Sequence, residues 1–245
     1  MGQKVNPISF RMGVTQQWRS RWYATKKNFG DWLVEDSRIR KFVRSEYGFA
    51  GISRIEIERI GEKLTVVLSA ARPGLLIGRR GAKVDKIGED LSILIGRNID
   101  VQIRDLETPE LDAQIVGEAI GEQLARRAPY RRAIRRYAEM VMDLGAKGVK
   151  IQVKGRLGGA EIARCEHIVL GKVPLQTLRA DIDFGMSTAI LSKGTIGIKT
   201  WIYKGEIFGK ADKPAAPALR APLGGAGAPP RPAPEAAPKQ APKPE

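Results

Sequence analysis

Residues 73–95 read PGLLIGRRGAKVDKIGEDLSILI, and this stretch decides how the first half of the chain folds. Its centre, Gly78-Arg79-Arg80-Gly81, follows a short apolar run and precedes a predicted helix whose apolar face is formed by Val84, Ile87, Leu91 and Leu94. Two glycines let a backbone approach a phosphate closely, and the arginines and the amides at the helix start supply positive potential. The stretch predicts a loop that holds a sugar–phosphate chain, with Lys83 as a further contact.

The Gly-x-x-Gly spacing alone is weak evidence, because it recurs at Gly48, Gly145, Gly155, Gly194 and Gly224. The surroundings of position 78 distinguish it. A helix capped by Asp31 and ended at Gly48 is followed by a predicted hairpin near 55–69, and a third strand near 99–103 follows the amphipathic helix. This αββααβ order favours a KH module, whose loop clamps about four nucleotides, over an ordinary solvated turn at a helix start.

The charge of the chain indicates the same class of partner. Lys and Arg number 42 against 27 Asp and Glu, which gives a net charge of +15. Such an excess favours a polyanion. Nucleic acid is favoured over an acidic membrane surface, because the most basic predicted helix lacks the Trp, Phe and Leu that a membrane-surface helix carries opposite its charges. We expect no membrane span, because no run of 18 apolar residues occurs, and a reducing cytoplasm, because there is one cysteine and no secretory signal.

A second basic feature is the helix predicted from Tyr130 to about Leu144. Its arginines fall within about 140° of one another at ~3.6 residues per turn, and apolar residues lie opposite them. Since a solvated charge run usually mixes both signs, this single-sign face predicts RNA contact. The face consists of Arg131, Arg132, Arg135 and Arg136, and the apolar side of Ala133, Ile134, Tyr137, Met140 and Val141.

The other segments complete a plan of four parts: an arm (1–29), a first domain (30–108), a second domain (109–208) and a tail (209–245). The arm mixes basic residues with aromatic ones and has no regular period, so we expect an extended segment. Its aromatic residues either stack on RNA or pin the arm to the protein core, and both interpretations stay open. They are Phe10, Trp18, Trp22 and Tyr23.

The second domain is predicted to be a two-layer α+β unit. A helix is expected from Pro109 to about Arg127, then the basic helix, then a strand over 149–153. The stretch GRLGGAEIARCEHIVLG (155–171) predicts a loop and a helix, and strands near 178–184 and 195–203 close the unit. Ten of the 15 prolines lie beyond residue 210, so the tail is expected to be disordered and most simply inert.

Catalytic chemistry finds little support. His167 is the only histidine, and Cys165 is interpreted as a small packed residue. Asp181 and Asp183 alternate on a predicted strand near Arg179 and indicate a structural ion-pair cluster. No nucleotide-binding motif or metal-ligand cluster occurs in the sequence, so we expect no enzyme, no cofactor and no metal. An RNA-processing enzyme would need such a site.

Six segments resemble one family, the KH-containing protein of the bacterial small ribosomal subunit, the third in that subunit's naming. Between them they span residues 1–205, with the tail outside. One departure is His167, where an aromatic residue is expected in many relatives. The segments are MGQKVNPISFRMG (1–13), SRWYA (20–24), IGRRG (77–81), GRLGGAEIAR (155–164), LRADIDFG (178–185) and GTIGIKTWI (194–202).

The resemblance implies a type II KH domain followed by a two-layer α/β C-terminal domain. It implies a place in the head of the small subunit, with 16S rRNA, mRNA and neighbouring ribosomal proteins as partners and no small-molecule substrate. The family's Arg-Arg-x-x-basic helix, which contacts and helps to unwind mRNA at its entrance, matches Arg131, Arg132 and Arg135, with Arg136 beside them. A free-standing KH regulator of mRNA is the alternative. The residues expected to bind rRNA are Lys4, Arg11, Arg19, Arg21, Lys26, Lys27, Arg156 and Arg164.

Overall fold

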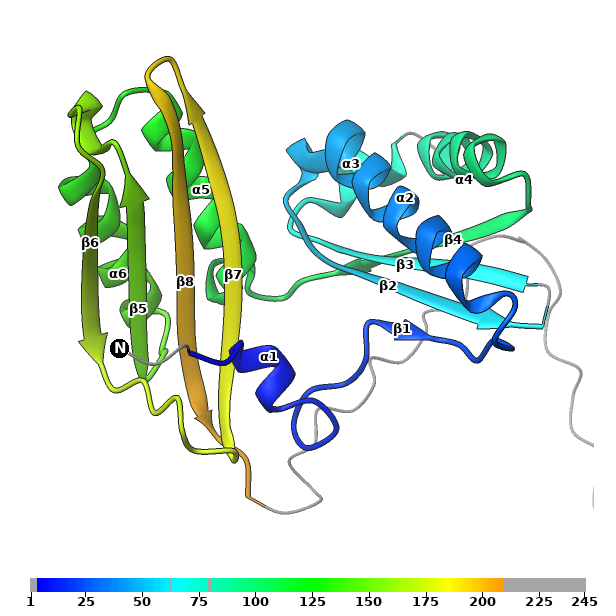
Figure 1. Ribbon diagram of the computed structural model, residues 1–245, viewed down its shortest axis with the longest axis horizontal. Coiled ribbons are helices and arrows are strands. Elements are labelled where there is room, and N and C mark those ends of the chain that lie inside the picture. The colour runs from blue at the N-terminus through cyan, green and yellow to red at the C-terminus, as the bar shows by residue number, and fades with distance from the viewer. Residues whose placement is uncertain (1–3, 62, 79–80, 209–245) are drawn as a thin grey trace, which may run out of the picture. The chain divides into compact units, whose positions relative to one another are not determined.

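The computed structural model describes residues 4–61, 63–78 and 81–208, which contain two four-stranded sheets with helices packed against each (Figure 1). The first sheet has the strand order β1-β2-β3-β4. The β1–β2 and β3–β4 pairs are parallel and the β2–β3 pair is an antiparallel hairpin. The strands are β1 (Ser20–Arg21), β2 (Ile52–Ile60), β3 (Lys63–Ala70) and β4 (Ile99–Asp105).

The helices of this first part confirm the αββααβ order around the glycine-rich stretch. Apolar side chains of both long helices pack on the sheet: Ile39 and Val43 from one helix, Ile87 and Leu91 from the other, are fully buried. The first helix begins at Phe29, with Asn28 and not Asp31 at the N-cap position, and Asp31 lies in its first turn. The helices are α2 (Phe29–Tyr47), the 3-10 turn η1 (Gly48–Ala50), α3 (Pro73–Ile77) and α4 (Ala82–Ile95).

A buried ionic cluster fastens α2 and the arm to the first sheet. Asp36, which is fully buried, receives an ion pair from Arg59 Nη2 at 2.6 Å, and its second oxygen accepts hydrogen bonds from Ser20 Oγ and Trp22 Nε1, both at 2.9 Å. The Arg59 guanidinium also lies over the Trp32 ring, 5.0 Å from its centroid. A buried carboxylate needs this many partners, because an unpaired one would cost several kcal/mol.

The second sheet is wholly antiparallel, in the order β6-β5-β8-β7, and two helices cover one of its faces (Figure 1). The core between them contains fully buried Val116 and Ile120 from one helix and Ile151 and Ile198 from the sheet. The two-layer α+β arrangement is therefore confirmed. The strands are β5 (Gly148–Gly155), β6 (Arg164–Gly171), β7 (Ala180–Leu191) and β8 (Gly194–Glu206), and the helices are α5 (Ala113–Ala125) and α6 (Tyr130–Asp143).

Two predictions about this second part are wrong. Residues 164–171 form the edge strand β6 and not a helix, because each of them pairs with β5 and alternate side chains face opposite sides of the sheet. Pro109 begins only the short 3-10 helix η3 (Pro109–Leu111), and α5 begins at Ala113. Its N-cap residue is Asp112, whose side chain accepts hydrogen bonds from the amides of Gln114 and Ile115.

The arm is partly structured, since it contains the short helix α1 (Pro7–Phe10) and strand β1. The expected disorder of residues 209–245 lies outside the described residues. None of the described helices is long and apolar enough to cross a membrane.

Candidate nucleic-acid interface

The glycine-rich loop begins directly after α3. Gly78 and Gly81 have φ values of 68° and 85°, in the left-handed region that favours glycine. A Cβ on Gly78 would lie 2.7 Å from Lys83 Cγ, so any side chain there would displace the lysine, whose Nζ donates to the Leu75 carbonyl at 3.2 Å. The predicted contacts Arg79 and Arg80 lie outside the described residues.

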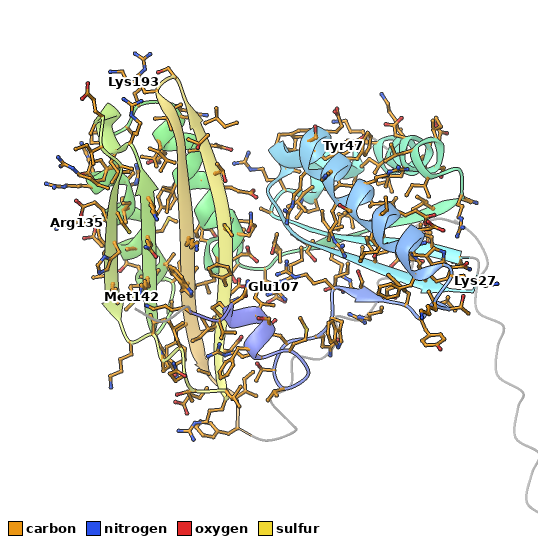
Figure 2. The ribbon with its side chains drawn as sticks, in the orientation of Figure 1. Lys27, Tyr47, Glu107, Arg135, Met142 and Lys193 are labelled. Carbon is orange, nitrogen blue, oxygen red and sulfur yellow. The ribbon has the colours of Figure 1, made fainter. Side chains whose placement is uncertain are left out.

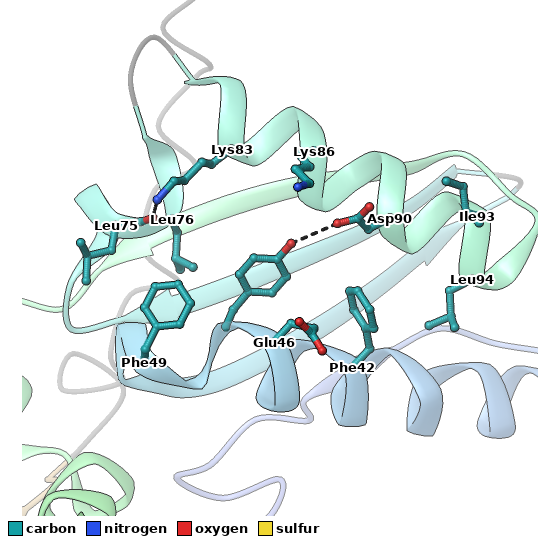
Figure 3. Close-up of a pocket in the computed structure, with 11 residues that line it drawn as sticks. Phe42, Glu46, Phe49, Leu75, Leu76, Lys83, Lys86, Asp90, Ile93 and Leu94 are labelled. Atoms are coloured by element: carbon teal, nitrogen blue, oxygen red, sulfur yellow. Dashed lines mark hydrogen bonds between the residues drawn. The ribbon is translucent and has the colours of Figure 1, made fainter.

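A groove of about 600 Å³ runs between α2 and α4 beside this loop (Figure 3). Across it Tyr47 Oη donates to Asp90 Oδ2 at 3.2 Å. Burial raises the pKa of Tyr47, and the hydrogen bond to Asp90 adds to the effect, so the phenol stays protonated. Sequence reasoning missed this groove, because its walls come from two separate segments of the chain, 42–49 and 75–94. The lining residues are Phe42, Glu46, Tyr47, Phe49, Leu75, Leu76, Lys83, Lys86, Asp90, Ile93 and Leu94.

The arginine face of α6 is present as predicted. Arg131, Arg132, Arg135 and Arg136 are all exposed; Arg135 is labelled in Figure 2. Arg131 forms the only ion pair of the four among the described residues, to Glu166 at 3.9 Å. Arg131 is largely solvated and Glu166 is half-buried, so this long pair contributes at most about 1 kcal/mol and leaves the arginine available.

The opposite side of α6 fixes the direction in which the arginines point. Ala133, Ile134, Ala138 and Val141 are buried against the second sheet. Tyr137 is half-buried, and its Oη accepts a hydrogen bond from Gln123 Nε2 of α5 at 3.1 Å. The helix therefore cannot rotate its charges toward the core without exposing this apolar stripe.

Arg11 is not an RNA contact, which corrects that prediction. Its side chain is fully buried, and Nε donates to the Ala180 carbonyl at 2.7 Å while Nη2 donates to the Leu175 and Thr177 carbonyls at 3.0 and 2.9 Å. Nη1 donates to the Pro7 carbonyl at 3.2 Å. Since these carbonyls occupy the guanidinium, Arg11 ties the arm to the end of β7.

The other basic residues of the arm differ in availability. Lys4, Lys26 and Lys27 are exposed. Arg21 is half-buried and paired with Glu56 and Glu58, each at 3.2 Å. Burial lowers the pKa of the half-buried Arg19, and repulsion from Arg54 lowers it further. The three exposed lysines are the strongest RNA-binding candidates of this set.

Some aromatic residues of the arm pack on the protein core, and others are exposed and available for RNA. Trp22 packs edge-on to Trp32, with ring centroids 5.6 Å apart, and hydrogen-bonds Asp36, so it pins the arm to the core. Trp18 and Tyr23 are 65% and 90% exposed and stay free to stack on RNA bases.

Arg156 lines a pocket of about 390 Å³ next to the start of α6. Arg127 and Lys193 line the same pocket; Lys193 is labelled in Figure 2. Arg156 Nε donates to the Ala160 carbonyl at 2.8 Å and Nη1 donates to the Lys193 carbonyl at 3.2 Å. The side chain therefore also connects the loop at Ala160 with the turn at Lys193. Arg164, at the start of β6, is exposed.

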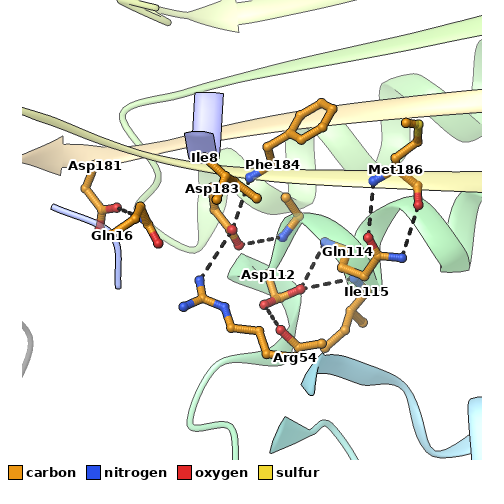
Figure 4. A network of polar contacts seen from close by, with 12 residues as sticks. Ile8, Gln16, Arg54, Asp112, Gln114, Ile115, Asp181, Asp183, Phe184 and Met186 are labelled. Carbon is orange, nitrogen blue, oxygen red and sulfur yellow. Dashed lines mark hydrogen bonds and ion pairs between the residues drawn. The ribbon is translucent and has the colours of Figure 1, made fainter. Parts of the chain in front are cut away.

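The acidic residues on β7 form a different network from the predicted one (Figure 4). Asp183 accepts from the Ala113 amide at 3.0 Å and pairs with Arg54 at 3.4 Å, while Arg179 pairs instead with Glu206 at 2.7 Å. Burial raises the pKa of Asp112, and the nearby charge of Asp183 raises it further.

The remaining candidates are the cysteine and possible metal-ligand groups. Cys165 is exposed on β6 and not packed, which corrects its interpretation. Within the described ranges no group of three His, Cys, Asp or Glu side chains is arranged to hold a metal ion. The polar features of the described site are cationic surfaces and fixed loops, a combination that suits contact with a phosphate backbone.

Comparison with known proteins agrees with this geometry. The KH domain family matches residues 38–111, and the family described as ribosomal protein S3, C-terminal domain, matches residues 120–202. A protein of Rhodopirellula baltica named small ribosomal subunit protein uS3 is 51% identical over 210 residues, which cover 84% of this chain and 89% of that protein. The protein of the same name from Desulfovibrio desulfuricans is 49% identical, with 86% and 98% covered.

The chain belongs to the ribosomal protein S3 family. The S3 family consists of structural components of the ribosome, so the chain is not an enzyme. Its KH domain is an RNA-binding module, and the chain is therefore an RNA-binding structural protein. The S3-family resemblance of the six sequence segments is confirmed over the matched residues.

Proposed function

We propose that this chain is built into the head of the bacterial small ribosomal subunit in the cytoplasm, where it binds 16S rRNA and lines the mRNA entrance beside neighbouring ribosomal proteins. The observation that carries the proposal is the exposed arginine face of α6, held outward by a buried stripe. The four domains would run over 1–29, 30–108, 109–208 and 209–245. The loop at 78–81, including Arg79 and Arg80, and the exposed basic residues of the arm would contact RNA.

The proposed mechanism at the entrance is passive. Arginines on one helix face bind phosphates without reading bases, because a guanidinium donates to any phosphate oxygen. As the ribosome moves along the mRNA, Arg131, Arg132 and Arg135 hold the separated strand and hinder its re-pairing. Movement of the ribosome supplies the work, so the chain needs no nucleotide site of its own.

Sedimentation of cell extract through a sucrose gradient at low salt tests the ribosomal placement. We expect the chain in the small-subunit fractions. A chain that stays at the top of the gradient would refute the placement and favour a free-standing regulator of mRNA.

Substitution of Arg131, Arg132 and Arg135 by alanine tests the role of α6. Ribosomes carrying this variant should translate a structured mRNA several-fold more slowly than wild type and an unstructured mRNA at the same rate. The matched control replaces Arg38, Lys41 and Lys63, three exposed basic residues of α2 and β3, by alanine. Equal slowing on both templates, or equal effects of the two variants, would count against the proposal.

A further inference from the structure

The face of the second sheet opposite α5 and α6 is covered by no long helix among the described residues, although the four-residue helix α1 contacts β7. Strand register identifies its residues: on this face Gln152 of β5 pairs with His167 of β6 and with Lys199 of β8. Glu166, the neighbour of His167, points the other way, because it meets Arg131 on α6. The face that contains Gln152 is therefore opposite to α5 and α6, which lie behind the sheet in Figure 1.

One end of this face is covered by the chain itself. Ile182, Trp201 and Tyr203 form an apolar cluster there, closed by the loop that contains Val173 and Leu175. The remainder is open, since Met186 and Val169 are 55% and 46% exposed. The outward residues of the open part are Lys150, Gln152, Lys154, Cys165, His167, Val169, Phe184, Met186, Thr188, Ile190, Thr195, Gly197 and Lys199.

All the formally charged side chains on the open part are positive. Lys150 and Lys154 are four residues apart on β5, so their Cα atoms are separated by about 13 Å. Lys199 on the neighbouring strand β8 lies diagonally across from Lys154. No outward position in this part is Asp or Glu, and none of the three lysines forms an ion pair with any residue that the structure describes. Like charges left unneutralised on neighbouring strands repel, which an anionic partner would relieve.

Aromatic rings lie within the same face. Lys150 Nζ lies 5.3 Å from the centroid of the Trp201 ring, and Phe184 packs against that ring with centroids 5.3 Å apart. Gln152 and His167 add hydrogen-bonding groups between the lysines. Trp201 is buried and Phe184 half-buried, so these rings hold Lys150 in place, and contacts with RNA would come from the lysines, Gln152 and His167.

We propose that this lysine face, defined by Lys150, Lys154 and Lys199, binds a segment of ribosomal RNA separate from the RNA at α6. The inference rests on the proposed function and adds a second RNA-binding surface to the arginine face of α6. Three lysines without an outward carboxylate favour RNA, a polyanion, as the partner. Because α6 lies on the opposite side of the sheet, the domain presents two basic surfaces that face different ways and can bridge two RNA segments.

The full chain with Lys150, Lys154 and Lys199 replaced by glutamine tests the lysine face. Binding to a 16S rRNA transcript is measured against salt concentration, with R38Q/K41Q/K63Q as the control that loses the same charge. We expect affinity to fall at least tenfold more than in the control. The slope of log K against log salt should decrease by roughly 2–3, since each phosphate contact contributes ~0.7–0.9.

Three outcomes would overturn the inference. Equal affinity and slope for the variant and the control would show that the face binds no RNA. If RNA binding equals that of the control while the variant is depleted from assembled subunits, the occupant is a protein. If wild type itself fails to bind the transcript, the proposed function fails as well. K154Q/K199Q, which changes only exposed residues, repeats the test should circular dichroism show that the triple variant is misfolded.

Discussion

At the scale of single residues, charge alone is a poor guide to which side chains meet RNA. Arg11 and Lys27 look equivalent in the sequence, yet one is fully buried and the other exposed. The carbonyls that bind Arg11 lie more than 160 residues further along the chain, at Leu175, Thr177 and Ala180. No local pattern could have shown this contact, because it exists only after the arm has docked on β7.

Replacing Arg11 by alanine should therefore destabilise the fold and leave direct RNA contacts intact. The carbonyls of Pro7, Pro174, Leu175, Thr177 and Ala180 would lose their donor, and we expect the free energy of unfolding to fall by about 3 kcal/mol. Urea unfolding measures this. Arg38→Ala, an exposed arginine, is the control and should change stability by less than about 0.5 kcal/mol. A loss as small as that of the control would show that the buried contacts contribute little.

The buried carboxylates predict how stability depends on pH. Burial raises the pKa of Asp112, Asp181 and Glu118 above their unfolded values. An acid with a raised pKa holds its proton more tightly in the folded state, so its contribution favours folding at low pH and is lost as pH rises through the folded pKa. The Asp112→Asn variant, which keeps a capping side chain but cannot ionise, should lack its share of this dependence.

Unfolding of wild type and Asp112→Asn at pH 5 and pH 7 measures this contribution. The stability of the variant relative to wild type should be greater at pH 7 than at pH 5. A difference that is the same at both pH values, or has the opposite sign, would contradict the raised pKa of Asp112.

At the scale of elements, periodicity predicted most of the helices and strands. It failed where hydrogen bonding to a neighbouring strand determines whether a segment is a helix or a strand. The αββααβ order and the limits of α6 follow from local patterns, since each element there has a clear apolar face. Residues 164–171 have an equally apolar sequence, and only their pairing with β5 makes them a strand. The lysine face was missed for the same reason, because lysines from β5 and β8 come together only through register.

Close packing of α5 on β7 makes one glycine essential. A Cβ on Gly185 would overlap the Ala113 carbonyl and lie 2.6 Å from the Gln114 nitrogen, so Gly185→Ala must push the start of α5 from the sheet. We expect a loss of about 2–3 kcal/mol in the free energy of unfolding. Gly197→Ala on β8 is the matched control, because its nearest contact is Lys154 O at 3.9 Å. Similar losses in both variants would refute the packing argument.

At the scale of the whole molecule, the described residues and the family matches end near the same place. The matches extend to residue 202 and β8 to Glu206. The fold class was predictable, because two separate apolar patterns each specify a sheet covered by helices. The placement of the arm was not predictable from the sequence. It depends on contacts with residues distant in the sequence, since Arg11 binds the Ala180 carbonyl and Trp22 binds Asp36.

Removal of residues 209–245 should leave folding and most RNA affinity intact. The removed segment carries six basic and three acidic residues, so the remaining chain keeps a net charge of +12 out of +15. We expect an unchanged midpoint of thermal unfolding and less than about a threefold loss of affinity for 16S rRNA at ~150 mM salt. The midpoint by calorimetry and affinity by filter binding measure this. A tenfold loss would give the tail an active part in binding.

The exposed thiol of Cys165 makes spectroscopic work on this chain simple. It is the only cysteine among 245 residues, and it points outward from β6, opposite Lys154. A maleimide dye or a nitroxide therefore attaches at one known position without any engineered substitution. A probe there lies at the border of the lysine face, so its emission or mobility should report, in real time during subunit assembly, when that face becomes covered.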